Sequence, residues 1–277
     1  MRRSLAVLAL ALATTVSAQQ IRTDGAEREG ATFNVLIPIA GDVAGANGTH
    51  FQTDVTLANR SPFPAHVGVF WLPQGRSGSV TTPIAELDLA ANTTRFFPAF
   101  VTDVLHQTGL GAFFVRALKP DGTTNFDALI DVYARIWTPS PNGAPGTFSQ
   151  GIYGASLRGP GVDDFQPVDG WIYGLRQNAD FRTNYGIVNL ENAPRTFDII
   201  ADGDNGAHFT RTVTLPAASM IHDPLPQGQN FGQVTIRISI HQEIPPTFDL
   251  RWCGFGSTVD NRTGDAWYSK VQGTYLH

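Results

Sequence analysis

Two nine-residue segments, Phe51–Asn59 (FQTDVTLAN) and Phe181–Asn189 (FRTNYGIVN), determine the predicted fold of this chain. In both, larger apolar residues alternate with small or polar ones, and Phe, Thr and Asn recur at the first, third and ninth positions. Alternation with a period of two predicts a β-strand that buries one face. The return of the same pattern later in the chain predicts an internal duplication.

Further pairs of similar blocks follow these two segments in the same order. The pairs are Ala65–Phe70 with Arg195–Ile200, Leu87–Thr93 with Val213–Ser219, Gly111–Arg116 with Gly232–Arg237, and Asp131–Ile136 with Cys253–Thr258. Blocks that keep their order while their spacing drifts are what duplicated strands with variable loops produce.

The rest of the chain has the composition of short strands joined by turns. The whole chain contains 28 glycines and 18 prolines, more than an average globular protein has. The best helical candidate is the short segment Pro98–Gln107. Strands are predicted at Asn34–Ile39, Phe51–Leu57, Ala65–Leu72, Ala112–Ala117, Ala128–Trp137, Tyr185–Leu190, Thr196–Ile200, Thr210–Leu215, Gln233–Ile240 and Phe248–Trp252.

We therefore predict an all-β protein of two tandem, internally duplicated β-sandwich (Ig-like) units in close contact. Unit 1 is expected at residues 34–138 and unit 2 at residues 171–277. Residues 139–170 form a Gly/Pro-rich crossover, which we expect to be ordered because Phe148, Ile152 and Tyr153 favour burial. A single larger sandwich or barrel is the alternative.

The first 18 residues have the pattern of a cleavable signal peptide. Arg2 and Arg3 precede the apolar run Leu5–Ala13, and Val16–Ala18 places compact residues at the expected cleavage site. The run is too short to span a bilayer, which needs about 20 apolar residues. We expect a secreted or periplasmic protein, with residues 19–33 as an N-terminal segment and no membrane insertion after cleavage.

Charge and cysteine content narrow the possible partners. The chain has 19 basic and 24 acidic residues and no basic cluster, which argues against nucleic acid as a partner. Cys253 is the sole cysteine, so no intrachain disulfide can form and stability must come from a packed core. The expected partner is an unidentified protein or glycan outside the cytoplasm.

Several blocks resemble a type of uncharacterised secreted bacterial β-sandwich repeat protein. The resemblance rests on Leu36–Gly41, Gly45–Asn59, Gly174–Asn189 and Val259–Asp265. It implies a β-rich fold and an exported protein, and it supplies no catalytic residues.

One segment is a candidate ion site. Asp202, Asp204 and Asn205 place oxygen ligands around a glycine-rich turn, which suits Ca²⁺, although the distal glutamate of an EF-hand is missing. The same residues also favour a hairpin turn. Asp260–Asp265 has the same two interpretations, and no cofactor other than calcium is expected.

Aromatic residues are the candidate ligand-binding groups. Trp71, Trp137, Trp171, Trp267 and Tyr268 could stack on sugar rings if they are exposed together. The alternative for each is burial in the core of a sandwich or between units.

No catalytic motif is present: a GxSxG elbow is absent, and acidic pairs such as Asp127 with Asp131, or Asp163 with Asp164, occur in any acidic protein. The leading hypothesis is a non-enzymatic exported protein for binding, adhesion or surface assembly. The alternative is a lectin-like carbohydrate-binding protein, with or without bound calcium, and the third is a hydrolase whose site the sequence does not reveal.

Overall fold

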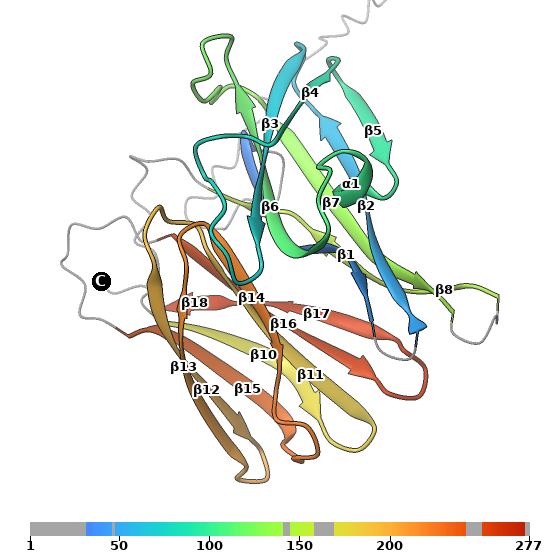
Figure 1. Ribbon diagram of the computed structural model, residues 1–277, viewed down its shortest axis with the longest axis vertical. Helices are drawn as coiled ribbons and strands as arrows, with labels where there is room; N and C mark the ends of the chain where they lie inside the picture. The colour runs from blue at the N-terminus through green and yellow to red at the C-terminus, as the bar shows by residue number, and fades with distance from the viewer. Residues whose placement is uncertain (1–31, 46–47, 141–144, 158–168, 242–250, 275–277) are drawn as a thin grey trace, which may run out of the picture.

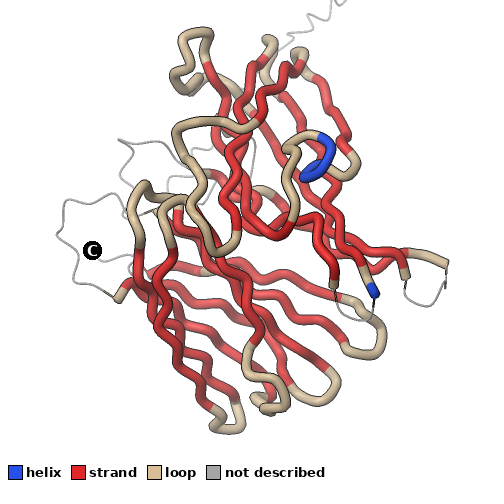
Figure 2. Tube along the Cα trace, in the orientation of Figure 1, coloured by secondary structure: helices blue, strands red, loops and turns tan. Residues whose placement is uncertain are grey.

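A computed structural model describes residues 32–45, 48–140, 145–157, 169–241 and 251–274. These residues form antiparallel strands in three sheets with one short helix, so the predicted all-β class is confirmed (Figures 1 and 2). The predicted signal peptide lies outside the described residues. Within them, no helix is long and apolar enough to cross a membrane.

The first half of the chain forms strands β1 to β9. Their bounds are β1 Asn34–Ala44, β2 His50–Asn59, β3 Ala65–Pro73, β4 Ala85–Leu89, β5 Thr93–Phe97, β6 Gly109–Leu118, β7 Ile130–Pro139, β8 Thr147–Tyr153 and β9 Ala155–Ser156. They make one continuous hydrogen-bonded sheet that joins two layers. Layer 1 is β5-β2-β7-β8 and layer 2 is β4-β3-β6-β1-β9, connected where Val43 and Ala44 pair with Phe51 and His50.

The second half forms strands β10 to β18 in two separate sheets. The bounds are β10 Asp169–Gln177, β11 Phe181–Asn189, β12 Arg195–Gly203, β13 His208–Leu215, β14 Ser219–Pro224, β15 Gly232–Ile240, β16 Trp252–Asp260, β17 Ala266–Lys270 and β18 Gln272–Thr274. Layer 3 is β14-β11-β16-β17 and layer 4 is β13-β12-β15-β10-β18. Figure 1 shows the first half in the upper part of the molecule and the second half in the lower part.

Every strand pairing of the second half has a counterpart in the first half. For example, β1 pairs with β6 as β10 pairs with β15, and β2 pairs with β7 as β11 pairs with β16. The first of these ladders shifts register at matching places, between Ile37 and Ala40 and between Ile172 and Leu175. The two halves therefore share one strand order and one irregularity.

The registers align the same blocks as the sequence comparison, with one exception. Gly232 takes the place of Gly109 at the end of its ladder, where both have positive φ, rather than the place of Gly111. The sequence comparison was therefore wrong by two residues at this block. A shift of two keeps each side chain on the same face of the sheet, so alternation alone cannot detect it.

Two differences from the sequence expectations concern irregular segments. The stretch expected to be a crossover contains β8 and β9, which pair with β7 and β1. The helix is shorter than its candidate segment: α1 spans Phe100–Asp103 only and follows Ala99, which has φ 44°. Phe248 of the predicted strand Phe248–Trp252 lies outside the described residues, and β16 begins at Trp252.

A buried asparagine ends β2, and another ends the equivalent strand β11. The Asn59 amide donates to the carbonyls of Phe63 (2.9 Å) and Ala90 (3.0 Å), and its oxygen accepts the Ser61 amide (2.9 Å). Asn59 is 1 % exposed. The hydrogen bonds that these backbone groups would make to water in the unfolded chain are therefore replaced by hydrogen bonds to the asparagine side chain.

Asn189 makes the matching set of contacts in the second half. Its amide donates to Ala193 (2.9 Å) and Pro216 (2.8 Å), and its oxygen accepts the Glu191 amide (3.1 Å). We call these two residues the asparagine clamps. Each clamp fixes the turn after its own strand to the turn that leads into the edge strand β5 or β14.

Replacing either clamp with leucine should strongly destabilise the protein. Asn59→Leu or Asn189→Leu leaves two carbonyls and an amide without partners, and each buried unpaired group costs about 1–3 kcal/mol. We expect a loss of about 3–5 kcal/mol in urea unfolding followed by circular dichroism. Asn230→Leu, an exposed asparagine with one such contact, should cost about 1 kcal/mol. A similar loss in all three variants would contradict the special role of the clamps.

The two halves meet through an apolar joint between layers 2 and 3. Val188, Met220, Cys253 and Phe255 of layer 3 belong to the core cluster of the first half, whereas Ile187 of layer 3 belongs to the core of the second half. Layer 3 is therefore buried on both faces. This explains why β16 is buried from Trp252 through Thr258.

On the layer 2 side of the joint, aromatic rings form the surface. Phe113 contacts Phe100 of α1 inside the first half, at 5.1 Å between ring centroids, so the next residue, Phe114, points to the opposite face. Phe114 stacks on Phe70 at 4.4 Å, and the Arg116 guanidinium lies 4.9 Å from both rings. Strands β3 and β6, which carry these rings, contact β14 of layer 3.

A loop of the first half also binds the edge of layer 3. The residues after β3 run beside β14, with Gly75 donating to the Met220 carbonyl (3.0 Å) and Gly78 donating to the Ala218 carbonyl (2.9 Å). Figure 1 shows this long loop, in teal, descending to β14. We call it the strap, because it covers the backbone groups of an edge strand that would otherwise be unpaired.

His222 makes the joint sensitive to acid. Its ring lies parallel to Phe255 at 5.8 Å, and its buried Nε2 has no hydrogen-bond partner. Burial lowers the pKa of His222 to about 4, against a smaller raising effect of Asp223. The unfolded chain, with an ordinary pKa of 6.5, therefore binds the proton more readily than the folded protein, and stability falls as pH drops from 6.5 towards 4.

The variant His222→Phe should remove this acid sensitivity. Between pH 7 and pH 5 the native protein should lose about 2 kcal/mol more stability than the variant, because a tenfold difference in proton affinity between the two states is worth about 1.4 kcal/mol. Urea unfolding at the two pH values measures the difference. Equal slopes for the native protein and His222→Phe would refute the assignment.

Candidate ligand-binding face

The outward face of layer 1 carries aromatic residues on three of its four strands. Val55 and Leu57 on β2 are fully buried in the core, so Thr56 between them points away from it. Thr56 pairs with Phe96 on β5 and with Tyr133 on β7, and Tyr133 pairs with Tyr153 on β8. Directly paired residues lie on the same face of a sheet, so Phe96, Thr56, Tyr133 and Tyr153 form one line.

The rings at the two ends of this row are exposed to solvent, and the central Tyr133 ring is half-buried. Phe96 is 63 % exposed and Tyr153 83 % exposed, and the rings of Tyr133 and Tyr153 lie 5.1 Å apart at 59°. With strands about 4.8 Å apart, the row from β5 to β8 is about 14 Å long. Large exposed aromatic side chains grouped on one face are typical of binding surfaces.

A glycine on β8 sets the position of the central ring. A Cβ atom added at Gly151 would lie 2.3 Å from the Tyr133 hydroxyl. The Tyr133 ring therefore leans across the sheet and rests over Gly151. A strand glycine that admits the close approach of another group is a recognised use of this residue.

Trp137 and Arg135 continue the same face along β7. The Arg135 guanidinium lies 5.8 Å from the Trp137 ring and donates to the Thr147 hydroxyl. Trp137 is half-buried, and its Nε1 has no hydrogen-bond partner. We define the aromatic face as Phe96, Tyr133, Arg135, Trp137 and Tyr153.

The other aromatic residues nominated from the sequence lie elsewhere and do not converge. Trp71 is 4 % exposed and belongs to the core of the first half. Trp171 lies on layer 4 beneath the Arg237 guanidinium (5.4 Å). Trp267 is 37 % exposed and donates to the Gly174 carbonyl (2.8 Å), whereas Tyr268 packs against the joint, where burial raises its pKa well above the ordinary value.

Of the five nominated residues, only Trp137 is on the aromatic face. Phe96, Tyr133 and Tyr153 were not predicted. Mainly tryptophans were selected from the sequence, without asking which face of its strand each aromatic residue occupies. The signal was available in part: Tyr133 stands between Val132 and Ala134, so the period of two already placed it on the outward face of its strand.

Of the candidate calcium residues, Asp202 lies at the end of β12, and Asp204 and Asn205 lie in the turn between β12 and β13. Asp202 pairs with His208 (2.7 Å), an Asp204 oxygen accepts the Gln233 amide (3.2 Å), and the Asn205 oxygen accepts the Ala207 amide (3.0 Å). The Asn205 contact closes the hairpin turn, the Asp204 contact joins the turn to β15, and the Asp202 pair links β12 to β13. Among the described residues, no group of three His, Cys, Asp or Glu side chains is arranged to hold a metal ion.

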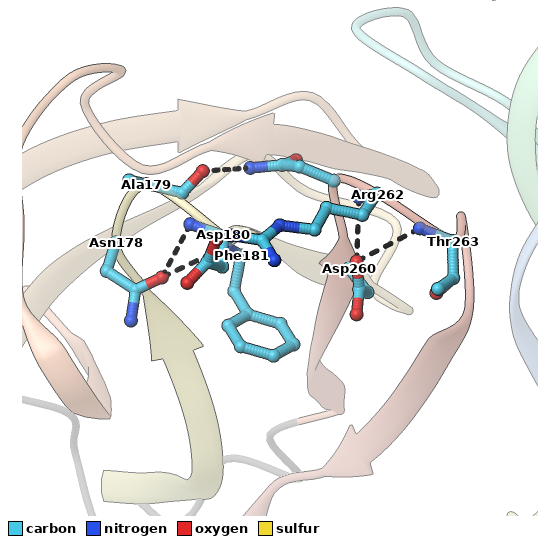
Figure 3. Close-up of polar contacts among 8 residues, drawn as sticks. Asn178, Ala179, Asp180, Phe181, Asp260, Arg262 and Thr263 are labelled. Carbon is cyan, nitrogen blue, oxygen red and sulfur yellow. Dashed lines mark hydrogen bonds and ion pairs between the residues drawn. The ribbon is translucent and has the colours of Figure 1, made fainter.

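The turn at Asp260–Asp265 is tied to the turn between β10 and β11 (Figure 3). An Asp260 oxygen accepts the backbone amides of Arg262 (2.7 Å) and Thr263 (3.0 Å). The amides of Thr263 and then Arg262 hold the pKa of the Asp260 carboxyl below its usual range. Arg262 in turn pairs with Asp180 (2.6 Å), so these charged groups join two loops of one sandwich.

Of the acidic pair Asp127 and Asp131, Asp127 is exposed and Asp131 forms an ion pair, whereas Asp54, another carboxylate of layer 1, is buried. Asp131 pairs with Arg60 (2.9 Å) on the outward side of layer 1. The Asp54 carboxylate, 9 % exposed, accepts the Ala99 amide (3.1 Å). Asp163 and Asp164 lie outside the described residues.

Comparison with known proteins adds little to this geometry. No family model and no curated protein matches the chain. Among solved structures, the chain has 14 % identity with a lectin from Pleurotus ostreatus in its apo form, over 90 % of this chain and 77 % of that one, with a TM-score of 0.16. A TM-score of that size does not indicate a shared fold, so the function must be argued from the aromatic face itself.

Filling the space over Gly151 should displace the Tyr133 ring without unfolding the protein. In Gly151→Val the new side chain occupies the position of the Tyr133 hydroxyl, and valine is well suited to a strand. A crystal structure or the ring resonances of Tyr133 should show a changed side-chain rotamer. Ser149→Val, on the same face of the same strand, should leave Tyr133 in place; an unmoved ring in Gly151→Val would show that the close approach does not position it.

Proposed function

We propose that this chain is an exported, non-enzymatic binding protein whose aromatic face binds a glycan. The observation that carries the proposal is the row of Phe96, Tyr133 and Tyr153 across layer 1. Sugar rings have apolar faces and polar edges, which suits aromatic rings interspersed with hydrogen-bonding groups such as the Thr56 hydroxyl. The row spans about 14 Å across the sheet, which favours an extended chain over a small enclosed molecule.

The proposal includes the origin of the fold. We infer that the two halves are duplicated Ig-like sandwich units, as the sequence blocks suggested. The support is that all strand pairings of the second half recur in the first, together with the asparagine clamps at Asn59 and Asn189. Residues 1–18 act as the signal peptide in this proposal, and the protein functions in the periplasm or outside the cell.

Removing an exposed ring of the row should weaken glycan binding. Tyr153→Ala and Phe96→Ala should each reduce affinity about ten-fold, because about 1.4 kcal/mol of stacking and burial is lost. Affinity electrophoresis and pull-down on a panel of soluble and insoluble polysaccharides, followed by a glycan array, measure the effect. The calcium hypothesis is tested in the same assay with EDTA: the face does not use Asp202 or Asp204, so affinity should not change.

Tyr173→Ala is the matched control for this experiment. Tyr173 is 53 % exposed but lies on β10 of the second half, so its removal should leave affinity unchanged. Two results would contradict the proposal: no binding to any polysaccharide by the native protein, or equal losses in Tyr153→Ala and Tyr173→Ala.

A further inference from the structure

The aromatic face has a cation, Arg135, for which no ion pair is found among the described residues. Arg135 lies on the same face as Tyr133, two residues further along β7, and its guanidinium contacts only the Trp137 ring and the Thr147 hydroxyl. It forms no ion pair with a carboxylate in the part of the chain that the structure describes. A half-buried guanidinium in this situation retains donors for an incoming anion.

Two other arginines on the outward faces of the sheets, Arg60 and Arg237, are each paired with a carboxylate. Arg60, also at layer 1, binds Asp131 at 2.9 Å. Arg237, which covers Trp171 on layer 4, binds Asp169 at 2.7 Å. The carboxylate nearest to Arg135 in register is Asp54, which is buried and bound to the Ala99 amide. Arg135 is therefore the position on this face that can take an external carboxylate.

From this geometry we propose that the glycan is acidic and that Arg135 binds the carboxylate of a uronic acid residue. The inference rests on the proposed function, since it assigns the ligand class of the same face. Arg135 pairs in register with Gly151, over which the Tyr133 hydroxyl lies. A guanidinium and a hydroxyl thus flank one position, and both can donate to a carboxylate.

The spacing suits a sugar ring stacked on the aromatic row. Residues two apart on a strand are separated by about 7 Å, so a ring on Tyr133 or Tyr153 places its carboxylate within reach of the long arginine side chain. The planar fork of arginine matches a carboxylate with two parallel hydrogen bonds. A sulfate ester offers a tetrahedral group in place of this planar partner, and we assign the site to the carboxylate.

The test compares polymers that differ only in charge. Affinity of the full chain is measured for polygalacturonate and alginate, and for the ester of each, in which the carboxylates are neutral. We expect at least ten-fold tighter binding to an acid form than to its ester, and a loss of this preference to within two-fold in Arg135→Gln. Arg60→Gln is the control, because Arg60 is paired, and should keep the preference; added salt should weaken binding of the acid form only.

Several outcomes would overturn the assignment. Equal affinity for acid and ester forms, or a preference that survives in Arg135→Gln, would remove Arg135 from recognition. Tighter binding of a sulfated polymer such as carrageenan would assign the site to sulfate. If neutral polysaccharides bind and both uronate polymers fail, this inference is wrong while the proposed function stands; if no polysaccharide binds, both are wrong.

Discussion

The structure depends on the burial of layer 3 on both of its faces. One face closes the core of the second half, and the other supplies Val188, Met220, Cys253 and Phe255 to the cluster that also holds the core of the first half. The two halves therefore share apolar surface that neither can bury alone. Without disulfides, this shared burial is the main source of cohesion between the halves, at roughly 25 cal/mol for each Å² of apolar surface removed from water.

The joint also explains which surface is left for binding. Layer 1 is the counterpart of layer 3 in strand order, yet its outward face remains uncovered among the described residues. The registers place Asp131 where layer 3 has Cys253, and Thr94 where it has Met220. Arg60, which follows the clamp Asn59 as Leu190 follows Asn189, pairs with Asp131. Charged and polar groups thus stand on layer 1 at the positions where layer 3 carries apolar side chains, and they disfavour the packing of another unit there.

Two positions of the aromatic row also carry rings in layer 3. Tyr133 takes the place of Phe255, and Phe96 takes the place of His222. In layer 3 these rings serve the contact between halves, whereas in layer 1 they are free for a ligand. The strap also strengthens the contact between the halves, because it covers the edge strand β14. The second half has only the short turn at Asp204–Ala207 in the equivalent place. The second half therefore has no strap that could bind the edge strand of a further unit.

The sequence was sufficient for the fold class, for most strands and for the matching blocks, because alternation and turn residues are local. It could not distinguish the rings of the joint from those of the free face. Trp71 and Trp137 both end strands of alternating apolar residues, yet one is in the core and the other faces out. What separates them is the partner of each face, which depends on how the layers stack and which no local pattern contains.

The same reasoning decides between the two free faces of the molecule. Layer 4 also presents an aromatic residue beside an arginine, but Arg237 is held between the Trp171 ring and the Asp169 carboxylate. A ligand there must break an ion pair in addition to losing its own water, which reduces the net gain from binding. On layer 1 the rings extend across four strands and Arg135 keeps its donors available. The cost of desolvation is lower where no internal partner has to be replaced, and binding is therefore expected on layer 1.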